Sequence, residues 1–486
     1  MKKIILSIVS VFLFAGAGAL RAENFGVPSE CEDVMLQAFY WDSYKTQTST
    51  DSKYGRTKWI DLLTDTAAIN SNFDLVWLPP SAYSTGGVGY YHKKLSNQSS
   101  TWGQRTNLES FIAALHAGNT KVLADIVINH RGNKSNWCDF EEDDFGSYGK
   151  FQLTSAHICY GDECFTTSGS TCYNSTTRGA SDTGTNDAGA RDLDHTSELV
   201  QNWAKAYVQW MRSEMRYDGF RYDMTRGYSG RYLSMYNEVS RPYISVSEFW
   251  TDLASQQTHL QTAGYNTMVF DFPLKYSING IKNGSYGKLN KNKSSFDGLR
   301  KNGLEKYSVT FIDNHDTFER SDNQDDEFAG YNADLSSASV KNWILQANAY
   351  ILMLPGVPCV FWPHWKSYQS EINELIAVRK RAGIHSESAV TDEETSQNMY
   401  TATIQGHHGT VILRLGTKRS KEVPEGYELA VEGGDRGEYT IFIAGAPQGM
   451  NDVTDEMKSS KFIEDGQLFI RVGEKVYDAQ GRLIEK

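Results

Sequence analysis

The chain has 486 residues, 40% of them hydrophobic, so it is long enough to form two or three domains with a substantial core. Its net charge of −12 argues against a nucleic-acid partner, because nucleic-acid affinity comes chiefly from clustered Lys and Arg side chains. The 27 Tyr and 11 Trp residues favour a protein that stacks aromatic rings on flat apolar faces, such as those of sugars.

The first residues have the pattern of an export signal. Two lysines precede an apolar run from Ile4 to about Ala15, and small residues follow. This order predicts a secretory signal peptide over residues 1–22, cleaved after Ala19 or Ala22. The run is shorter than the roughly 20 residues of a membrane span, and no later segment is long enough either. We therefore expect a secreted or periplasmic protein without a membrane span.

Four of the six cysteines crowd one loop-rich stretch: Cys138, Cys159, Cys164 and Cys172. In an exported chain this grouping predicts two disulfides, with three possible connectivities. A zinc site is the alternative, but the stretch contains neither a C-x-x-C motif nor a paired Cys/His spacing.

Between residues 23 and 385, strand-like segments alternate with segments of helical period. Eight strands, mostly followed by helices, predict an α/β fold, the (β/α)8 TIM barrel. A doubly wound open sheet is the alternative, but it would usually carry a Gly-rich phosphate loop after an early strand, and the sequence has none. The predicted strands begin at Met35, Asp74, Val122, Gly219, Tyr243, Thr267, Val309 and Pro358.

The alternation is interrupted once and then replaced by a different pattern. Residues 131–191 are rich in Gly, Ser, Thr, Asp and Cys, which predicts an inserted domain after the third strand, with the barrel formed by 23–130 and 192–385. Short strands over 386–445 predict a C-terminal antiparallel β-sheet domain. Residues 446–486 predict one more small β unit, whose role the sequence does not reveal.

Acidic residues follow four of the predicted strands, where a barrel of this kind has its active site. They are Asp125, Asp223, Glu248 and the segment Asp313-Asn314-His315-Asp316. Any one of these acids could be a loop residue or a helix cap. Four on one rim indicate a function, because clustered carboxylates repel one another.

Two of these acids differ in their neighbours. Arg221 shares a strand face with Asp223, and a guanidinium favours an ionised carboxylate. Glu248 has no cation at the neighbouring same-face positions, Val246 and Trp250. One ionised and one protonated carboxyl group, about 5 Å apart, are what retaining glycoside hydrolysis requires. This pattern favours Asp223 as the nucleophile and Glu248 as the general acid.

Four segments resemble the signature segments of the α-amylase family of retaining glycoside hydrolases, and of its plant-type branch most closely. They are ADIVINH (124–130), GFRYDMTRG (219–227), SEFW (247–250) and FIDNHD (311–316), in the family's order. The resemblance implies that Asp223 is the nucleophile, Glu248 the general acid/base and Asp316 the third carboxylate. It implies that Arg221 orients Asp223, that Asp125 supports the site, that His130 and His315 bond sugar hydroxyls, and that Tyr90 and Trp250 are aromatic platforms.

The resemblance also implies a calcium ion between the barrel and the inserted domain. Asn129, Asp182 and Asp192 match side-chain ligands, and backbone oxygens of Gly227 and Arg191 would complete an oxygen-rich shell. The segment after Tyr90, the Cys-rich segment 161–177 and the tail depart from the family's pattern.

From these features we expect an exported, monomeric α-amylase. It would hydrolyse internal α-1,4 bonds of starch-like glucans and maltooligosaccharides. The alternatives are an α-glucan transglycosylase or debranching enzyme on the same scaffold, and a non-catalytic starch-binding protein.

Overall fold

A computed structural model gives the fold of most of the chain. It describes residues 25–45, 51–84, 87–186, 189–318, 320, 335–433, 438–445, 459–464, 467–472, 475–478 and 483–485. The predicted signal peptide lies outside these ranges. Within them, no helix is both long enough and apolar enough to cross a membrane.

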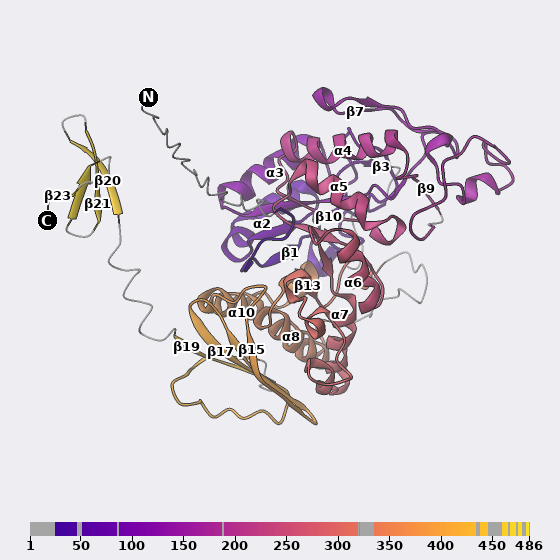
Figure 1. The fold of residues 1–486 in the computed structure, drawn as a ribbon. Helices are drawn as coiled ribbons and strands as arrows, with labels where there is room; N and C mark the ends of the chain where they lie inside the picture. The colour runs from indigo at the N-terminus through magenta and orange to yellow at the C-terminus, as the bar shows by residue number, and fades with distance from the viewer. Residues whose placement is uncertain are drawn as a thin grey trace, which may run out of the picture.

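The centre of the molecule is a closed barrel of eight parallel strands (Figure 1). Each lies within about two residues of a predicted position, so the predicted TIM barrel is confirmed. Its strands are buried along most of their length, as parallel strands covered on both faces should be. In barrel order they are β1 (Met35–Gln37), β14 (Val357–Phe361), β13 (Ser308–Phe311), β12 (Met268–Phe270), β11 (Ser245–Ser247), β10 (Gly219–Tyr222), β5 (Lys121–Ile126) and β2 (Leu75–Trp77).

Helices surround the barrel (Figure 1). In α4 (Glu198–Ser213), Val200, Trp203, Tyr207 and Met211 recur every three or four residues and are all buried. The remaining helices are α1 (Asp51–Tyr54), α2 (Trp59–Asn72), α3 (Arg105–Ala117), α5 (Gly230–Ser240), α6 (Leu253–Thr262), α7 (Phe272–Ile278), α8 (Ala338–Met353), α9 (Trp362–Ser367) and α10 (Gln369–Ala382).

The C-terminal domain is a five-stranded antiparallel sheet that packs on α8 and α10 (Figure 1). Alternate residues of its central strands are buried, which is why the period of two was readable in the sequence. In sheet order its strands are β15 (Val390–Ser396), β16 (Met399–Gln405), β17 (Gly409–Leu415), β19 (Tyr439–Gly445) and β18 (Glu428–Gly433). The tail forms a separate sheet of β20 (Ser459–Glu464), β21 (Gln467–Val472), β22 (Lys475–Asp478) and β23 (Leu483–Glu485).

The segment between β5 and α4 leaves the barrel and returns to it through a short antiparallel pair. In that pair, β6 (His130–Arg131) lies beside β9 (Arg191–Asp192). A second small pair joins β7 (Asp143–Asp144) to β8 (Lys150–Phe151), and the hairpin of β3 (Tyr83–Ser84) and β4 (His92–Lys94) follows β2. The insertion after the third barrel strand is thereby confirmed.

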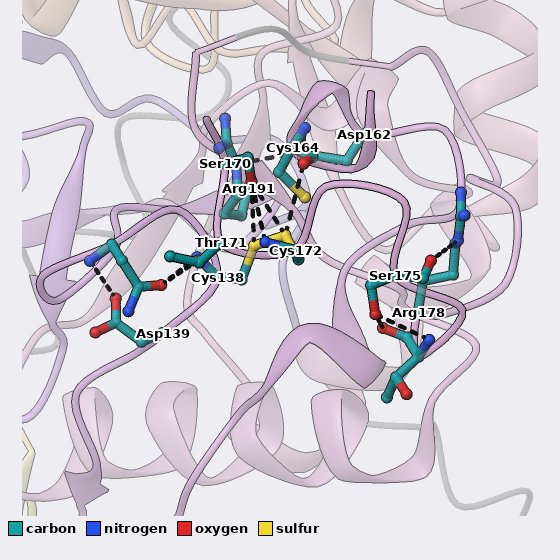
Figure 2. The surroundings of a disulfide bond; sticks show 12 residues. Cys138, Asp139, Asp162, Cys164, Ser170, Thr171, Cys172, Ser175, Arg178 and Arg191 are labelled. Carbon is teal, nitrogen blue, oxygen red and sulfur yellow. Dashed lines mark hydrogen bonds and ion pairs between the residues drawn. A yellow bond between two sulfur atoms is a disulfide. The ribbon is translucent and has the colours of Figure 1, made fainter. Parts of the chain in front are cut away.

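The prediction of two disulfides in this insertion is wrong. Of its four cysteines, all of which the structure describes, only Cys138 and Cys172 are bonded to each other. Cys159 and Cys164 are buried thiols. Figure 2 shows Cys164 beside the disulfide, and its thiol cannot pair because the two sulfurs near it are already joined. Spacing in the sequence could not reveal this, because the loop conformation decides which sulfurs meet.

Candidate active site

One arginine holds three carboxylates at the carboxyl ends of the barrel strands. Arg221 lies in β10 with 1% of its side chain exposed. Its Nη1 atom is 2.8 Å from an oxygen of Asp125 and 2.7 Å from one of Asp223. Its Nη2 atom is 2.7 Å from an oxygen of Glu248. Because β5, β10 and β11 are neighbours in the barrel, the acids that end them converge on this guanidinium.

The structure corrects one premise about Glu248. The sequence placed no cation at its neighbouring positions on the same strand, yet Arg221 reaches it from the adjacent strand. Glu248 also accepts a hydrogen bond of 2.9 Å from the backbone N–H of Met224. The different protonation of the two acids therefore has to come from their surroundings, not from the presence or absence of a cation.

Burial sets the protonation of these acids. It raises the pKa of Glu248 to about 8, with further upward contributions from Asp223 and Asp316, while Arg221 lowers it. Burial likewise raises the pKa of Asp223 to about 7, against the lowering effect of Arg221. The ion pair does not keep the pKa of Asp223 low, as the sequence suggested, because desolvation is the larger effect. Because the pKa of Glu248 is higher than that of Asp223, a single proton shared by these two acids lies on Glu248.

Asp316 reaches the same site from the segment after β13. One of its carboxylate oxygens is 3.1 Å from Nε2 of His315, and it also forms an ion pair with Arg320. Burial lowers the pKa of His315 to about 3, so its imidazole is neutral. The Gln37 amide lies 3.0 Å from Nδ1 of this ring. If the amide donates to Nδ1, the proton of the neutral imidazole is on Nε2, towards Asp316.

Tyr90 links the two halves of this network. Its hydroxyl donates to Asp125 over 3.0 Å and lies 2.7 Å from Nε2 of His315. Its ring is roughly parallel to those of His315 and Trp41, with centroid distances of 5.3 and 6.3 Å, and those two rings are themselves 6.1 Å apart. Tyr90 is therefore held at both its hydroxyl and its ring, so it presents a fixed aromatic surface.

A cavity of about 540 Å³ opens over these groups. This volume is within the range of small-molecule sites. Asp223, Glu248 and Asp316 all line it, so the three predicted catalytic acids share one space. The other lining residues are Trp41, Tyr90, Tyr91, His130, Met224, Arg226, Trp250, Tyr276 and Arg320.

Of the remaining predicted substrate residues, Trp250 and His130 line the cavity, whereas His315 is buried behind it. Trp250 stacks on Phe272 at 4.6 Å and donates from its indole N–H to the Tyr276 hydroxyl over 2.9 Å. His130 lies 3.1 Å, through Nε2, from the backbone oxygen of Tyr90. Arg221 and Asp125 do not line the cavity. Arg221 instead holds Asp223 and Glu248, which do line it, and Asp125 holds Tyr90.

Some residues of the site were not predicted from the sequence. Trp41, on the loop after β1, stacks parallel to His315, and the guanidinium of Arg320 lies 3.8 Å above its ring. Trp77 donates from its indole N–H to Asp125 over 3.1 Å. Gln37 and Trp77 are the last residues of β1 and β2, so the rule that barrel sites lie at strand ends could have found them.

Some of the predicted metal ligands contact one another beside this site. Asn129 follows β5, and its amide donates to Asp192 over 3.3 Å. Gly227 approaches Asn129 so closely that a β-carbon would lie 1.9 Å from the amide oxygen. The turn at Gly184 packs against the backbone at Gly227, and Asp182 accepts from the Gly184 N–H over 2.9 Å in that turn. Asp182 has one buried carboxylate oxygen, Oδ2, with no hydrogen-bond partner.

A bound hard cation would satisfy that orphaned oxygen, and carboxylate, amide and backbone oxygens are the ligands it prefers. The residues present therefore fit the implied calcium ion. The fifth predicted ligand, Arg191, points its side chain away, towards Asp162 and Glu163, so only its backbone could contribute. Asp162 in turn accepts from the backbone N–H of Asp192 over 2.9 Å, which fixes the strand that carries that acid.

Barrel enzymes that cleave glycosidic bonds carry paired carboxyl groups of unequal pKa at the strand ends, so fold and site together define a glycoside hydrolase. The family described as "Alpha amylase, catalytic domain" matches residues 70–364, more than half of the chain, which therefore belongs to the alpha-amylase family. As a member it is an enzyme of the glycoside hydrolase class that acts on α-glucans.

Known relatives agree with this assignment. The chain is 29% identical over 399 residues to "Probable alpha-amylase 2" of Arabidopsis thaliana, covering 76% of this chain and 86% of that protein. It is 28% identical over 459 residues to "Alpha-amylase 3, chloroplastic" of the same plant, covering 87% of this chain but only 46% of the relative. These relatives are consistent with the resemblance to the plant-type branch.

The fold is shared with solved structures. The alpha-amylase from Geobacillus thermoleovorans, complexed with acarbose, superposes with a TM-score of 0.59 at 16% sequence identity, covering 86% of this chain and 99% of that one. At this identity the likeness concerns the fold alone.

Proposed function

We propose that this protein is an exported α-amylase that cleaves internal α-1,4 bonds of starch-like glucans with retention of anomeric configuration. The observation that carries the proposal is the bridge from Arg221 to both Asp223 and Glu248 at a cavity that Asp316 also lines. This bridge fixes two carboxyl groups of different proton affinity side by side, as double displacement requires.

In the first step Glu248 donates its proton to the oxygen of the leaving sugar, and Asp223 attacks the anomeric carbon. The raised pKa of Glu248 keeps it protonated at neutral pH. Arg221 holds the attacking carboxylate of Asp223 in one orientation through an ion pair of 2.7 Å. The C–O bond to the leaving sugar breaks as the bond to Asp223 forms, which inverts the anomeric carbon.

In the second step water hydrolyses the covalent glucosyl-enzyme. Glu248, now ionised, takes a proton from the water, and the water oxygen displaces Asp223 from the anomeric carbon. The second inversion restores the original configuration and returns both acids to their starting states. Asp316, held by His315 and Arg320, would grip the hydroxyls of the reacting sugar.

The cavity wall would position the glucan. Tyr90 and Trp250 present aromatic faces for stacking on sugar rings, and His130, also at the wall, would bond a hydroxyl group. We retain the proposal that His315 bonds a sugar hydroxyl, although it does not line the cavity. Asp125 would act indirectly, by holding Arg221 and Tyr90 in place.

A maltooligosaccharide blocked at its non-reducing end tests the proposal. Internal cleavage with release of α-anomeric products is the expected result, because the block prevents attack from the end. Products longer than the substrate would indicate a transglycosylase. An intact linear substrate, with cleavage of the α-1,6 branches of a branched glucan in a parallel assay, would indicate a debranching enzyme. Binding without new reducing ends would indicate a non-catalytic starch-binding protein.

We also propose that the cluster of Asn129, Asp182, Asp192 and the backbone of Gly227 and Arg191 binds Ca²⁺. The support is the orphaned oxygen of Asp182 and the close packing of Gly227 on Asn129. A bound calcium ion would neutralise the buried acids and join the inserted segment to the barrel.

Removal of this ion should lower the thermal stability of the protein. We expect chelation to lower Tm by about 5 °C, and Ca²⁺ but not Mg²⁺ to restore it, because Mg²⁺ requires near-ideal octahedral geometry at short distances and gives up its waters reluctantly. Asp182→Asn should weaken Ca²⁺ binding at least about tenfold by calorimetry. Asp144→Asn, which removes an exposed acid of the same insertion, is the matched control. A Tm that chelation does not change would argue against the site.

Export and a monomeric state complete the proposal. The signal-like pattern of residues 1–22 supports export. N-terminal sequencing of the mature protein after Ala19 or Ala22, and a monomer mass by light scattering, are the expected results.

A further inference from the structure

A group of histidine and glutamate side chains lies at the opposite end of the barrel from the cavity. Glu30 and Glu32 precede β1, and His385 follows α10, so both segments are at the amino ends of the strands. His407 belongs to the turn between β16 and β17 of the C-terminal sheet. One ligand atom each from Glu30, His385 and His407 lies within 4.8 Å of the others.

Backbone hydrogen bonds fix all three segments against one another. The N–H of His407 donates to the oxygen of Gly383 over 2.9 Å, which attaches the turn to the end of α10. The N–H of Ser386 donates to the oxygen of Cys31 over 2.9 Å, and that of Glu30 to the Glu387 carboxylate over 2.8 Å. The group is therefore preorganised, and its ligands would not need to be gathered from mobile chains.

The imidazole of His407 is oriented as a metal ligand usually is. Its Nδ1 atom lies 2.7 Å from the Glu32 carboxylate, and a proton on Nδ1 leaves the lone pair on Nε2. Nε2 faces a carboxylate oxygen of Glu30 at 3.8 Å. The His385 ring is 7% exposed and stacks on His407 at a centroid distance of 4.2 Å, and its Nδ1 accepts from the backbone N–H of Glu387 over 3.3 Å.

We propose that Glu30, His385 and His407 bind a divalent transition metal of the zinc class, with Glu32 as the residue that orients His407. Imidazole nitrogen with carboxylate oxygen is a ligand set of Zn²⁺. Ligands bound to one tetrahedral Zn²⁺ lie about 3.4 Å apart and an imidazole binds in the plane of its ring, so closing the shell requires His385 to turn out of its stack on His407 and the exposed Glu30 side chain to rotate. The ion would join the start of the barrel, its end and the C-terminal sheet, which gives it a stabilising and not a catalytic role.

Zinc binding is tested on the full chain in excess Ca²⁺, so that the calcium cluster remains filled. We expect one equivalent of Zn²⁺ by calorimetry, and a rise in Tm of about 3 °C at a hundredfold excess over Kd. Activity on soluble glucan at low temperature should not change, because the group is remote from the cavity.

Variants separate this site from adventitious binding. His407→Gln should weaken Zn²⁺ binding at least about tenfold, and Glu30→Gln, at a side chain 59% exposed, should do so without disturbing the fold. His408→Gln, at the next residue of the same turn, is the control and should bind as the wild type does.

The same residues could instead form only an ion pair between a protonated His407 and the two glutamates. In that case Zn²⁺ would leave the wild-type Tm unchanged. Either this result, or a wild-type Zn²⁺ affinity in both His407→Gln and Glu30→Gln, would overturn the assignment.

Discussion

Asp223→Asn is expected to reduce kcat on soluble starch by about four orders of magnitude or more, because an amide cannot form the glucosyl-enzyme. The substitution conserves shape and removes one of the acids that Arg221 holds. It also removes a carboxylate that repels Asp125 and Asp316, both of which raise the pKa of Asp223. The folded chain should therefore keep its Tm or gain a few degrees, as active-site substitutions often do.

Reducing-sugar assays and thermal melts check this pair of expectations. Asp144→Asn, an exposed acid paired with Lys150, is the matched control and should keep full activity. Near-wild-type turnover by Asp223→Asn would show that Asp223 is not the nucleophile. A large fall in Tm would instead assign Asp223 a structural role.

Glu248→Gln is expected to reduce kcat on starch by about three orders of magnitude, because the leaving sugar is no longer protonated. A maltosyl fluoride substrate needs no such protonation, so its first step should be largely spared. Comparison of the two substrates checks the role of Glu248 as the acid. Equal losses on both substrates would contradict it.

The same variant should alter how stability depends on pH. Burial raises the pKa of Glu248 from 4.5 to about 8, so the folded chain holds this proton more tightly than the unfolded chain does. Ionisation of Glu248 therefore costs stability, and the cost grows as pH rises from about 4.5 to about 8. Since Gln cannot ionise, the Tm of Glu248→Gln relative to wild type should increase across this window.

Thermal melts between pH 4 and pH 9 measure this difference. Glu109→Gln, at an exposed acid paired with Arg105, should give a flat difference and serves as the control. A flat difference for Glu248→Gln would mean that the buried environment does not raise its pKa.

The position of the barrel strands was readable from the sequence because it depends on local patterns. Runs such as Lys121–Ile126 and Val357–Phe361 are buried on both faces, so each is apolar along most of its length. Strands β3 and β15 were not predicted, because β3 has only two residues and β15, at the edge of the C-terminal sheet, is largely exposed and shows little apolar periodicity.

The acids of the site were also predictable, because the barrel topology places every strand end on one rim. Asp125, Asp223, Glu248 and Asp316 could be selected by that rule alone. The protonation of those acids could not, because it depends on burial and on a guanidinium that reaches Glu248 from a neighbouring strand. The failed prediction for the second disulfide has a similar origin, since loop conformation decided which sulfurs met.

The sequence by itself therefore determined the class of fold, the family and the residues at the strand ends, all of which follow from periodicity and from motifs a few residues long. Only the tertiary structure decided which groups touch: Arg221 with Asp125, 96 residues away, or His407 with Glu32, 375 residues away. The physical reason is that pKa values, ion pairs and metal ligand sets depend on distances of a few ångströms between side chains. Residues that are far apart in the sequence come within these distances only when the barrel has formed.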